Sequence, residues 1–240
     1  MSKLIELIVN FFKSLFGMVK DKEDVPKSPQ ESSSSENEGA EAEVPETPSE
    51  GKGKLEEKII VLDAGHGGKD PGAIGPRHET KEKNINILIA MKIEKILEEQ
   101  GANVKMIRTD DTFVPLTDRA FNAKSTHADA FVSIHCNSFS DPKVEGMEVY
   151  YHEGANDDLA ISIGNEMRKI TGHKYRGVKR DTLIYDSGFA VLRKSQPVDG
   201  ALVEVEFISN GIQEDLLLTT SFQERVAKAV ADGIVAHVMD

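Results

Sequence analysis

The stretch VLDAGHGGKDPGAIG, residues 61–75, joins the end of an apolar strand to a glycine-rich loop. Val61 and Leu62 belong to the apolar run, Asp63 ends it, and His66 is the single imidazole of the loop. A histidine in such a loop is often only a turn residue. Its role therefore depends on which other side chains the fold brings beside it.

Outward from this stretch, apolar runs of strand length alternate with segments of helical periodicity. Strands are expected at residues 58–65, 103–109, 128–137, 146–154 and 200–210, and helices at 82–101, 116–128, 157–172 and 221–239. We expect Gly101 to end the first helix and Thr117 or Asp118 to lie near the cap of the second. This order predicts an α/β fold, a single layered domain whose twisted, mainly parallel sheet is flanked by helices.

Polar side chains follow three of the expected buried strands. Residues 61–62 lead to Asp63 and His66, residues 131–134 lead to His135, and residues 202–203 lead to Glu204. If these strands are parallel neighbours, the side chains converge at one edge of the sheet, where α/β proteins bind ligands. Imidazole and carboxylate groups bind zinc, and a site with three protein ligands leaves a fourth position for water. A carboxylate that does not bind the metal can take the proton of that water.

The sequence therefore indicates a hydrolytic site with one zinc ion. A third ligand is expected among the carboxylates at the start of the first long helix, where Glu79 and Glu82 both qualify. The pattern of residues alone does not choose between them.

Five segments, in order, resemble the motifs of one family, the zinc-dependent N-acetylmuramoyl-L-alanine amidases of the amidase-3 type, which are bacterial and phage peptidoglycan hydrolases. The segments are LDAGHGGKDPGAIG, EKNINI, VSIHCN, FAVLR and LVEVEFISN, and the resemblance covers about residues 58–238. It implies that His66, Glu82 and His135 bind zinc and that Glu204 is the catalytic carboxylate. It also implies the reaction, hydrolysis of the amide between the lactyl group of muramic acid and L-alanine.

Two departures from the family pattern bear on these roles. The segment GPRHETKEK is longer and more charged than usual, which keeps Glu79 as a second candidate beside Glu82. Glu206 stands where the family usually has glycine. On a regular strand Glu206 shares the face of Glu204, whereas a bulge would turn it away, so Glu206 is the minor candidate for the catalytic role.

For three further residues, the sequence allows two interpretations each. Asp63 either orients His66 or begins the loop, Asn137 lies in a turn or beside the metal, and Arg193 binds a peptide carboxylate or packs on the surface. Cys136 is expected to face away from His135 as a buried thiol rather than a nucleophile. The histidines outside the motifs are expected to be ordinary packing or surface residues; these are His78, His127, His152, His173 and His237.

The formal net charge of −12 is unevenly distributed, since residues 21–57 hold twelve acidic and four basic side chains. No basic surface dominates, which argues against nucleic acid as a partner. Residues 21–55 are rich in Ser, Glu and Pro and predict a disordered linker, leaving residues 56–240 as the catalytic domain. The single cysteine excludes a disulfide within the chain.

Residues 1–20 carry apolar side chains at helical spacing, interrupted by Glu6 and Lys13. An amphipathic helix on a membrane surface or a partner protein fits this pattern better than a transmembrane span, and packing on the protein's own core is the alternative. No A-x-A-like cleavage site follows, so a cleavable signal peptide is not indicated. Two locations stay open: membrane association, or the cytoplasm until release to the wall.

Two other functions fit the same residues. One is a zinc peptidase that cuts within the peptide stem, and the other is a catalytically inactive module that binds or regulates the wall. The freed chemical group separates the first from the amidase, and metal content together with activity separates the second.

Overall fold

A six-stranded sheet with strand order β2-β1-β3-β6-β4-β5 forms the centre of the computed structural model, which describes residues 53–240. The expectations for residues 1–52 lie outside the described residues. The strands are β1 (Ile59–Ala64), β2 (Asn103–Met106), β3 (Ala130–Asn137), β4 (Met147–Tyr151), β5 (Tyr175–Arg180) and β6 (Gly200–Phe207). All neighbouring strands are parallel except β4 and β6, which are antiparallel. The predicted mainly parallel α/β sheet is confirmed.

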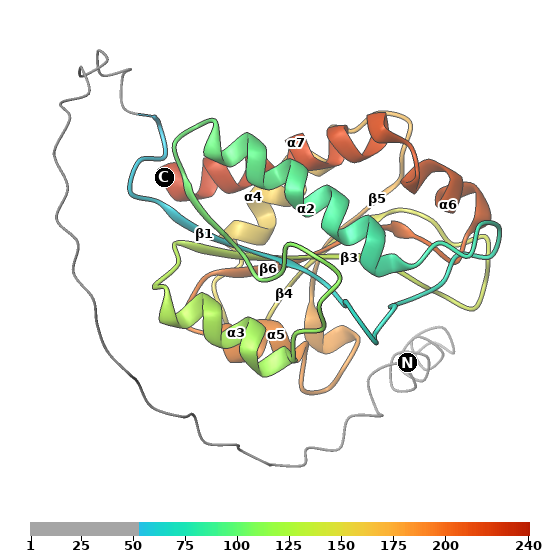
Figure 1. Ribbon diagram of the computed structural model, residues 1–240, viewed down its shortest axis with the longest axis horizontal. Coiled ribbons are helices and arrows are strands. Elements are labelled where there is room, and N and C mark those ends of the chain that lie inside the picture. The colour runs from blue at the N-terminus through green and yellow to red at the C-terminus, as the bar shows by residue number, and fades with distance from the viewer. Residues whose placement is uncertain (1–52) are drawn as a thin grey trace, which may run out of the picture.

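Helices cover both faces of this sheet (Figure 1). On one face lie α2 (Glu82–Glu98), α4 (Asp158–Met167) and α7 (Thr220–Met239), and on the other lie α3 (Leu116–Ser125) and α5 (Ala190–Ser195). Two short elements complete the fold, the 3-10 helix η1 (Asp181–Leu183) and the helix α6 (Gly211–Leu217). None of the helices within residues 53–240 is long and apolar enough to cross a membrane.

The apolar periodicity of the sequence explains these layers. In α2, Ile85, Ile89, Ile93 and Leu97 recur at helical spacing and are all buried against the sheet. Gly101 follows the helix with a φ of +94°, a conformation that glycine adopts without strain, which agrees with the expected stop. Strands β3 and β6 are buried on both faces, as expected for central strands.

The sequence did not predict β5, α5 or α6. The segment of β5, YRGVKR, is polar, and none of its residues is fully buried, because β5 lies at the edge of the sheet. The helices α5 and α6 have only 6 and 7 residues, too few for a clear period. Pro115 is the residue that caps α3, and Thr117 and Asp118 lie in the first turn of the helix, near the cap as expected.

Candidate metal centre

The three strands that end in polar side chains are neighbours in the sheet. Strand β3 lies between β1 and β6 and is parallel to both, with Asp63 opposite Ser133 and His135 opposite Glu204. The expectation that these strands are parallel neighbours is confirmed. The loop after β1 therefore begins beside the carboxyl end of β3, and it carries His66 to the same edge of the sheet.

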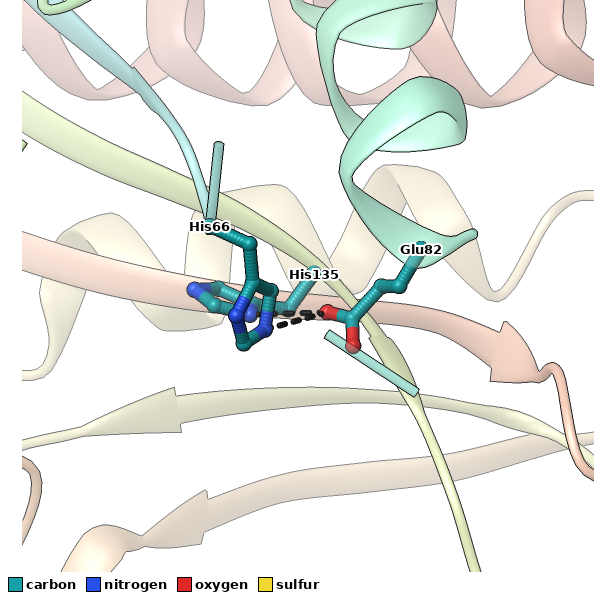
Figure 2. Close-up of side chains that lie close together, drawn as sticks. All are labelled: His66, Glu82 and His135. Atoms are coloured by element: carbon teal, nitrogen blue, oxygen red, sulfur yellow. Dashed lines mark hydrogen bonds and ion pairs between the residues drawn. The ribbon is translucent and has the colours of Figure 1, made fainter. Parts of the chain in front are cut away.

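His66, Glu82 and His135 form a cluster at this edge (Figure 2). Glu82 Oε1 lies 3.1 Å from His66 Nε2 and 2.9 Å from His135 Nδ1. One potential ligand atom of each residue lies within 4.8 Å of those of the other two. His66 comes from the loop, His135 from β3 and Glu82 from the first turn of α2, so the three donors are fixed by separate elements.

Glu82, and not Glu79, reaches this cluster. The Glu82 side chain is buried, and its Oε2 accepts a hydrogen bond from the backbone N–H of Ala73 at 2.9 Å. Its Oε1 also accepts from the backbone N–H of Cys136 at 3.1 Å. Glu79 is exposed on the preceding loop at a φ of +52°. The position of Glu82 at the start of α2 holds its carboxylate on rigid backbone.

Two glycines make the close approach possible. A Cβ atom added at Gly65 would lie 2.2 Å from a carbon of the His135 ring, so only glycine leaves room for this imidazole. A Cβ at Gly72 would lie 2.6 Å from Glu82 Oε2, and Gly72 also has a φ of +68°. The glycines of the loop thus serve the packing of the donor side chains against the backbone.

Two buried arginines, which the sequence analysis did not identify, hold the loop of His66 in place through its backbone carbonyls. Arg108 donates to the carbonyls of Ala64 and Gly65 at 2.7 and 3.0 Å. Arg119 donates to the carbonyl of His66 at 2.7 Å and forms an ion pair with Asp63 at 2.6 Å. Buried carbonyls need donors, and arginine supplies several from one side chain. Neither arginine lies in a recognisable motif, so the sequence held no signal for them.

The His66 ring is oriented by Asp70, another residue that sequence reasoning missed. Asp70 Oδ2 lies 2.8 Å from His66 Nδ1, which leaves Nε2 to face Glu82 and His135. A carboxylate four residues after a loop histidine was the available signal. Burial alone lowers the pKa of His66, but the charges of Glu82 and Asp70 outweigh burial and raise that pKa to about 10. The cluster therefore favours a positive charge at this position, as a cation site requires.

Glu204 lies on β6 directly opposite His135, on the same face of the sheet. Its carboxylate is buried, and Oε2 has no hydrogen-bond partner among the described residues. Burial, together with the charges of Glu82 and Glu148, raises the pKa of Glu204 well above its usual value. A buried carboxyl group with a raised pKa, next to a cation site, is suited to exchange protons with a substrate.

Glu206 is turned away from the cluster. The pairing of β3 with β6 shifts between His135 and Asn137, and this irregularity breaks the alternation that would place Glu206 beside Glu204. The Glu206 carboxylate instead accepts from the backbone N–H of Gly146 at 2.7 Å. Of the two readings that the sequence allowed, the structure shows the bulge.

The remaining candidates lie outside the cluster. The Asp63 carboxylate contacts Arg119 and Ser133, and the Asn137 side chain donates to Glu148 at 3.2 Å. Arg193 is exposed on α5 and donates to the carbonyls of Ser187 and Gly188. Cys136 is buried among apolar side chains on the other face of the sheet, and burial raises the pKa of its thiol well above the usual value. This places the thiol as expected.

The fold and the cluster together define a class: a mainly parallel α/β sheet that carries two histidines and one glutamate able to hold a metal ion, with a buried carboxyl group beside them. The comparisons with known proteins identify the family within this class. The family model described as N-acetylmuramoyl-L-alanine amidase matches residues 60–236. This chain therefore belongs to the N-acetylmuramoyl-L-alanine amidase family, and it is a hydrolase of the amide between N-acetylmuramic acid and L-alanine in peptidoglycan.

Individual relatives agree with this assignment. The chain is 32% identical over 221 residues to N-acetylmuramoyl-L-alanine amidase AmiA of Escherichia coli, covering 75% of this chain and 76% of AmiA. Among solved structures, the catalytic domain of CwlV, an N-acetylmuramoyl-L-alanine amidase from Bacillus (Paenibacillus) polymyxa, is 37% identical, with a TM-score of 0.69 over 75% of this chain and 97% of that one. AmiC2 of Nostoc punctiforme is 35% identical, with a TM-score of 0.70 over 79% and 100%. The resemblance inferred from the five motifs is confirmed.

Proposed function

We propose that this amidase binds one zinc ion through His66, Glu82 and His135 and that Glu204 moves the proton during hydrolysis. The observation that carries the proposal is the cluster of two imidazoles and one carboxylate with ligand atoms within 4.8 Å of one another. This donor set is typical of catalytic zinc, which keeps a position open for water. Asp70 fixes one imidazole from outside, as the outer partners of zinc-binding histidines do.

The chain's own residues have distinct tasks in this mechanism. When bound, zinc supplies Lewis acidity and lowers the pKa of water to about 7. Glu204 takes the proton of the attacking water and returns it to the leaving amine of L-alanine. The raised pKa of Glu204 favours the protonated carboxyl group that this return requires. The amide carbonyl carbon gains the hydroxyl group and loses the amine, so the products are the muramoyl carboxylate and a stem with a free amino group.

A Glu204→Gln variant tests this assignment. We expect a 10²- to 10⁴-fold loss of kcat, the usual contribution of general acid–base catalysis, with unchanged zinc content by elemental analysis. Glu206→Gln on the same strand is the matched control, because Glu206 contacts backbone and not the cluster. Activity of Glu204→Gln equal to wild type, or purified wild-type protein that neither retains nor needs zinc, contradicts the mechanism.

Digests of peptidoglycan by the wild-type protein show which bond is cut. Labelling of new amino termini is expected to find L-alanine attached to intact stems. New ends within the stem would instead identify a peptidase, and the absence of any new end would identify an inactive binding module.

We further propose that residues 56–240 form the catalytic domain, that residues 21–55 are a linker whose last residue, Leu55, packs into the core of that domain, and that residues 1–20 bind a membrane surface or a partner protein. The match of the family model to residues 60–236 supports the first part. Removing residues 1–50 is expected to leave hydrolysis of a soluble muropeptide intact and to abolish sedimentation with lipid vesicles. Loss of hydrolysis on truncation would contradict this division, and unchanged sedimentation would contradict the role of residues 1–20.

A further inference from the structure

A row of charged side chains leads from the metal cluster to the edge of the sheet. Glu204 on β6 lies opposite His135 of β3 on one side and opposite Glu148 of β4 on the other. Residues opposite one another on neighbouring strands share a face of the sheet. The next strand is β5, which carries Arg176 and Lys179.

A bulge in β5 turns both cations toward this row. In the pairing of β4 with β5, Met147 lies opposite Tyr175 and Val149 opposite Val178, so β5 has one extra residue between them. Gly177 lies at this irregularity with a φ of +99°, and a Cβ there would meet nothing within 4 Å. Regular alternation would place Arg176 and Lys179 on opposite faces. The extra residue places both on the face of Glu148, and both bind its Oε1, Lys179 at 2.6 Å.

Two cations, Arg176 and Lys179, contact one carboxylate, Glu148. Glu148 is buried, and its Oε2 also accepts from Asn137 and from the hydroxyl of Tyr150. Burial raises the pKa of Glu148, but Lys179 and the other donors outweigh burial and lower it, so the group carries one negative charge. One cation would balance that charge. Lys179 contacts no second carboxylate among residues 53–240.

Both cations are accessible from outside. The side chains of Arg176 and Lys179 are 24% and 27% exposed, in contrast to 3% for Glu148. Arg176 lies over the Phe207 ring at 5.3 Å, and Lys179 lies 6.0 Å from the centre of the Tyr150 ring. These aromatic contacts restrict the cations from one side, and Arg176 Nη1 also donates to the carbonyl of Glu145 at 3.5 Å.

The spacing fits a peptide. Neighbouring strands lie about 4.8 Å apart, so β5 is about 10 Å from β6, the span of about three extended residues. We propose that Arg176 and Lys179 form a subsite for a carboxylate of the substrate's peptide stem, within about three residues of the hydrolysed amide. The proposal rests on the amidase function and adds a preference for stems with free over amidated carboxylates. Arg193, the sequence-based candidate for this task, is instead held on α5 by the carbonyls of Ser187 and Gly188.

Two synthetic muramoyl tripeptides that differ only in free or amidated stem carboxylates test the subsite. We expect wild-type kcat/KM to be about tenfold higher for the free acid, because hydrogen bonds between charged groups are among the stronger ones. Lys179→Gln keeps a donor for Glu148 and removes the charge. In this variant the ratio is expected to fall to about 1, through the free-acid substrate alone and mainly through KM.

Arg180→Gln is the matched control. Arg180 lies on the same strand and pairs with the exposed Glu153. It is opposite Tyr151, whereas Lys179 is opposite Tyr150, so the two side chains lie on opposite faces of the sheet. The same loss of charge at Arg180 is therefore expected to leave the ratio of kcat/KM values unchanged. Equal wild-type rates on the two substrates, or an equal loss on both in Lys179→Gln, would overturn the subsite.

Calorimetric binding of the two peptides to Glu204→Gln separates this failure from failure of the amidase function. A tenfold preference in binding without any hydrolysis by wild type would refute the function and retain the subsite. Hydrolysis by wild type, without a preference for the free acid in rates or in binding, would refute the subsite and retain the amidase function.

Discussion

Gly65→Ala is expected to disable the proposed metal site while leaving the fold in place. The new Cβ would lie 2.2 Å from His135 Cε1 and 2.3 Å from Nε2. Carbon atoms in contact prefer about 3.5–4.0 Å, so the imidazole must move by more than about 1 Å. Metal ligands tolerate shifts of only about 0.2 Å, and a 1 Å misplacement at an active site reduces rates by about 10²-fold. We therefore expect at least a 10²-fold loss of activity and weaker retention of zinc.

The stability effect of Gly65→Ala is expected to be moderate. Inserting one methyl group into a packed site typically destabilises a protein by about 1–3 kcal/mol, and the φ of Gly65 lies outside the range that favours glycine. Zinc content by elemental analysis, hydrolysis of a muropeptide and chemical unfolding of the metal-free protein measure the three effects separately. The metal-free form is used because bound zinc would add its own stabilisation.

Gly200→Ala is the control for this experiment. Gly200 lies on β6, and its nearest contact is a flexible methyl of Leu192 at 3.3 Å, so the same substitution there is expected to leave zinc content and activity close to wild type. Wild-type zinc affinity and activity in Gly65→Ala would refute the argument that this glycine makes room for His135.

Three further predictions concern the supports of the site. Burial raises the pKa of Glu206 from 4.5 to about 7, so the folded protein keeps this proton to higher pH than the unfolded chain, and stability falls as the pH rises through that window. Glu206→Gln is expected to raise the free energy of unfolding by about 2–3 kcal/mol at pH 8 and by little at pH 4; equal effects at both would contradict the titration. Glu214 accepts three backbone N–H groups of the loop before α2, so Glu214→Ala is expected to lose about 3 kcal/mol by urea unfolding. The neighbouring Asp215→Asn, whose ion pairs are open to solvent, is expected to change stability much less. Arg119→Met leaves Asp63 buried without its cation and is expected to lose about 3–5 kcal/mol in the same assay, and a loss under about 1 kcal/mol would show that the pair is dispensable.

The apolar periodicity of the sequence predicts most of the fold. The long helices and the central strands carry strong apolar patterns because their faces are buried, and the parallel order of β1, β3 and β6 follows from the alternation of strands and helices. Both β2 and β5 lie at edges of the sheet, but β2 alternates between exposed and partly buried residues, whereas the polar β5 has no such alternation and was missed. The short helices α5 and α6 were missed because they have too few turns.

For the site, local sequence named the donors but not their partners. His66 lies in the loop after β1, and His135 and Glu204 lie in the carboxyl-terminal halves of β3 and β6. The position of such residues at one edge of a parallel sheet follows from the fold class. The family resemblance favoured Glu82 over Glu79, and the start of α2 in three dimensions brings Glu82 rather than Glu79 beside the histidines. Asp70 was within reach of the sequence, as a carboxylate four residues after His66 in the same loop.

The sequence by itself therefore determined the class of fold, because apolar periodicity repeats along the chain, and the family, because five motifs occur in order. It also indicated the three strands that carry the residues of the proposed site. Tertiary structure settled, between alternatives that the sequence had left open, that Glu82 joins the histidines and that a bulge turns Glu206 away. Tertiary structure alone decided that Arg108 and Arg119 hold the loop. It also decided that Arg176 and Lys179 converge on Glu148. These contacts join residues that are distant in the sequence, and the bulges come from a single extra residue in a strand. Neither kind of feature produces a repeating pattern of apolar residues that could be recognised in the sequence.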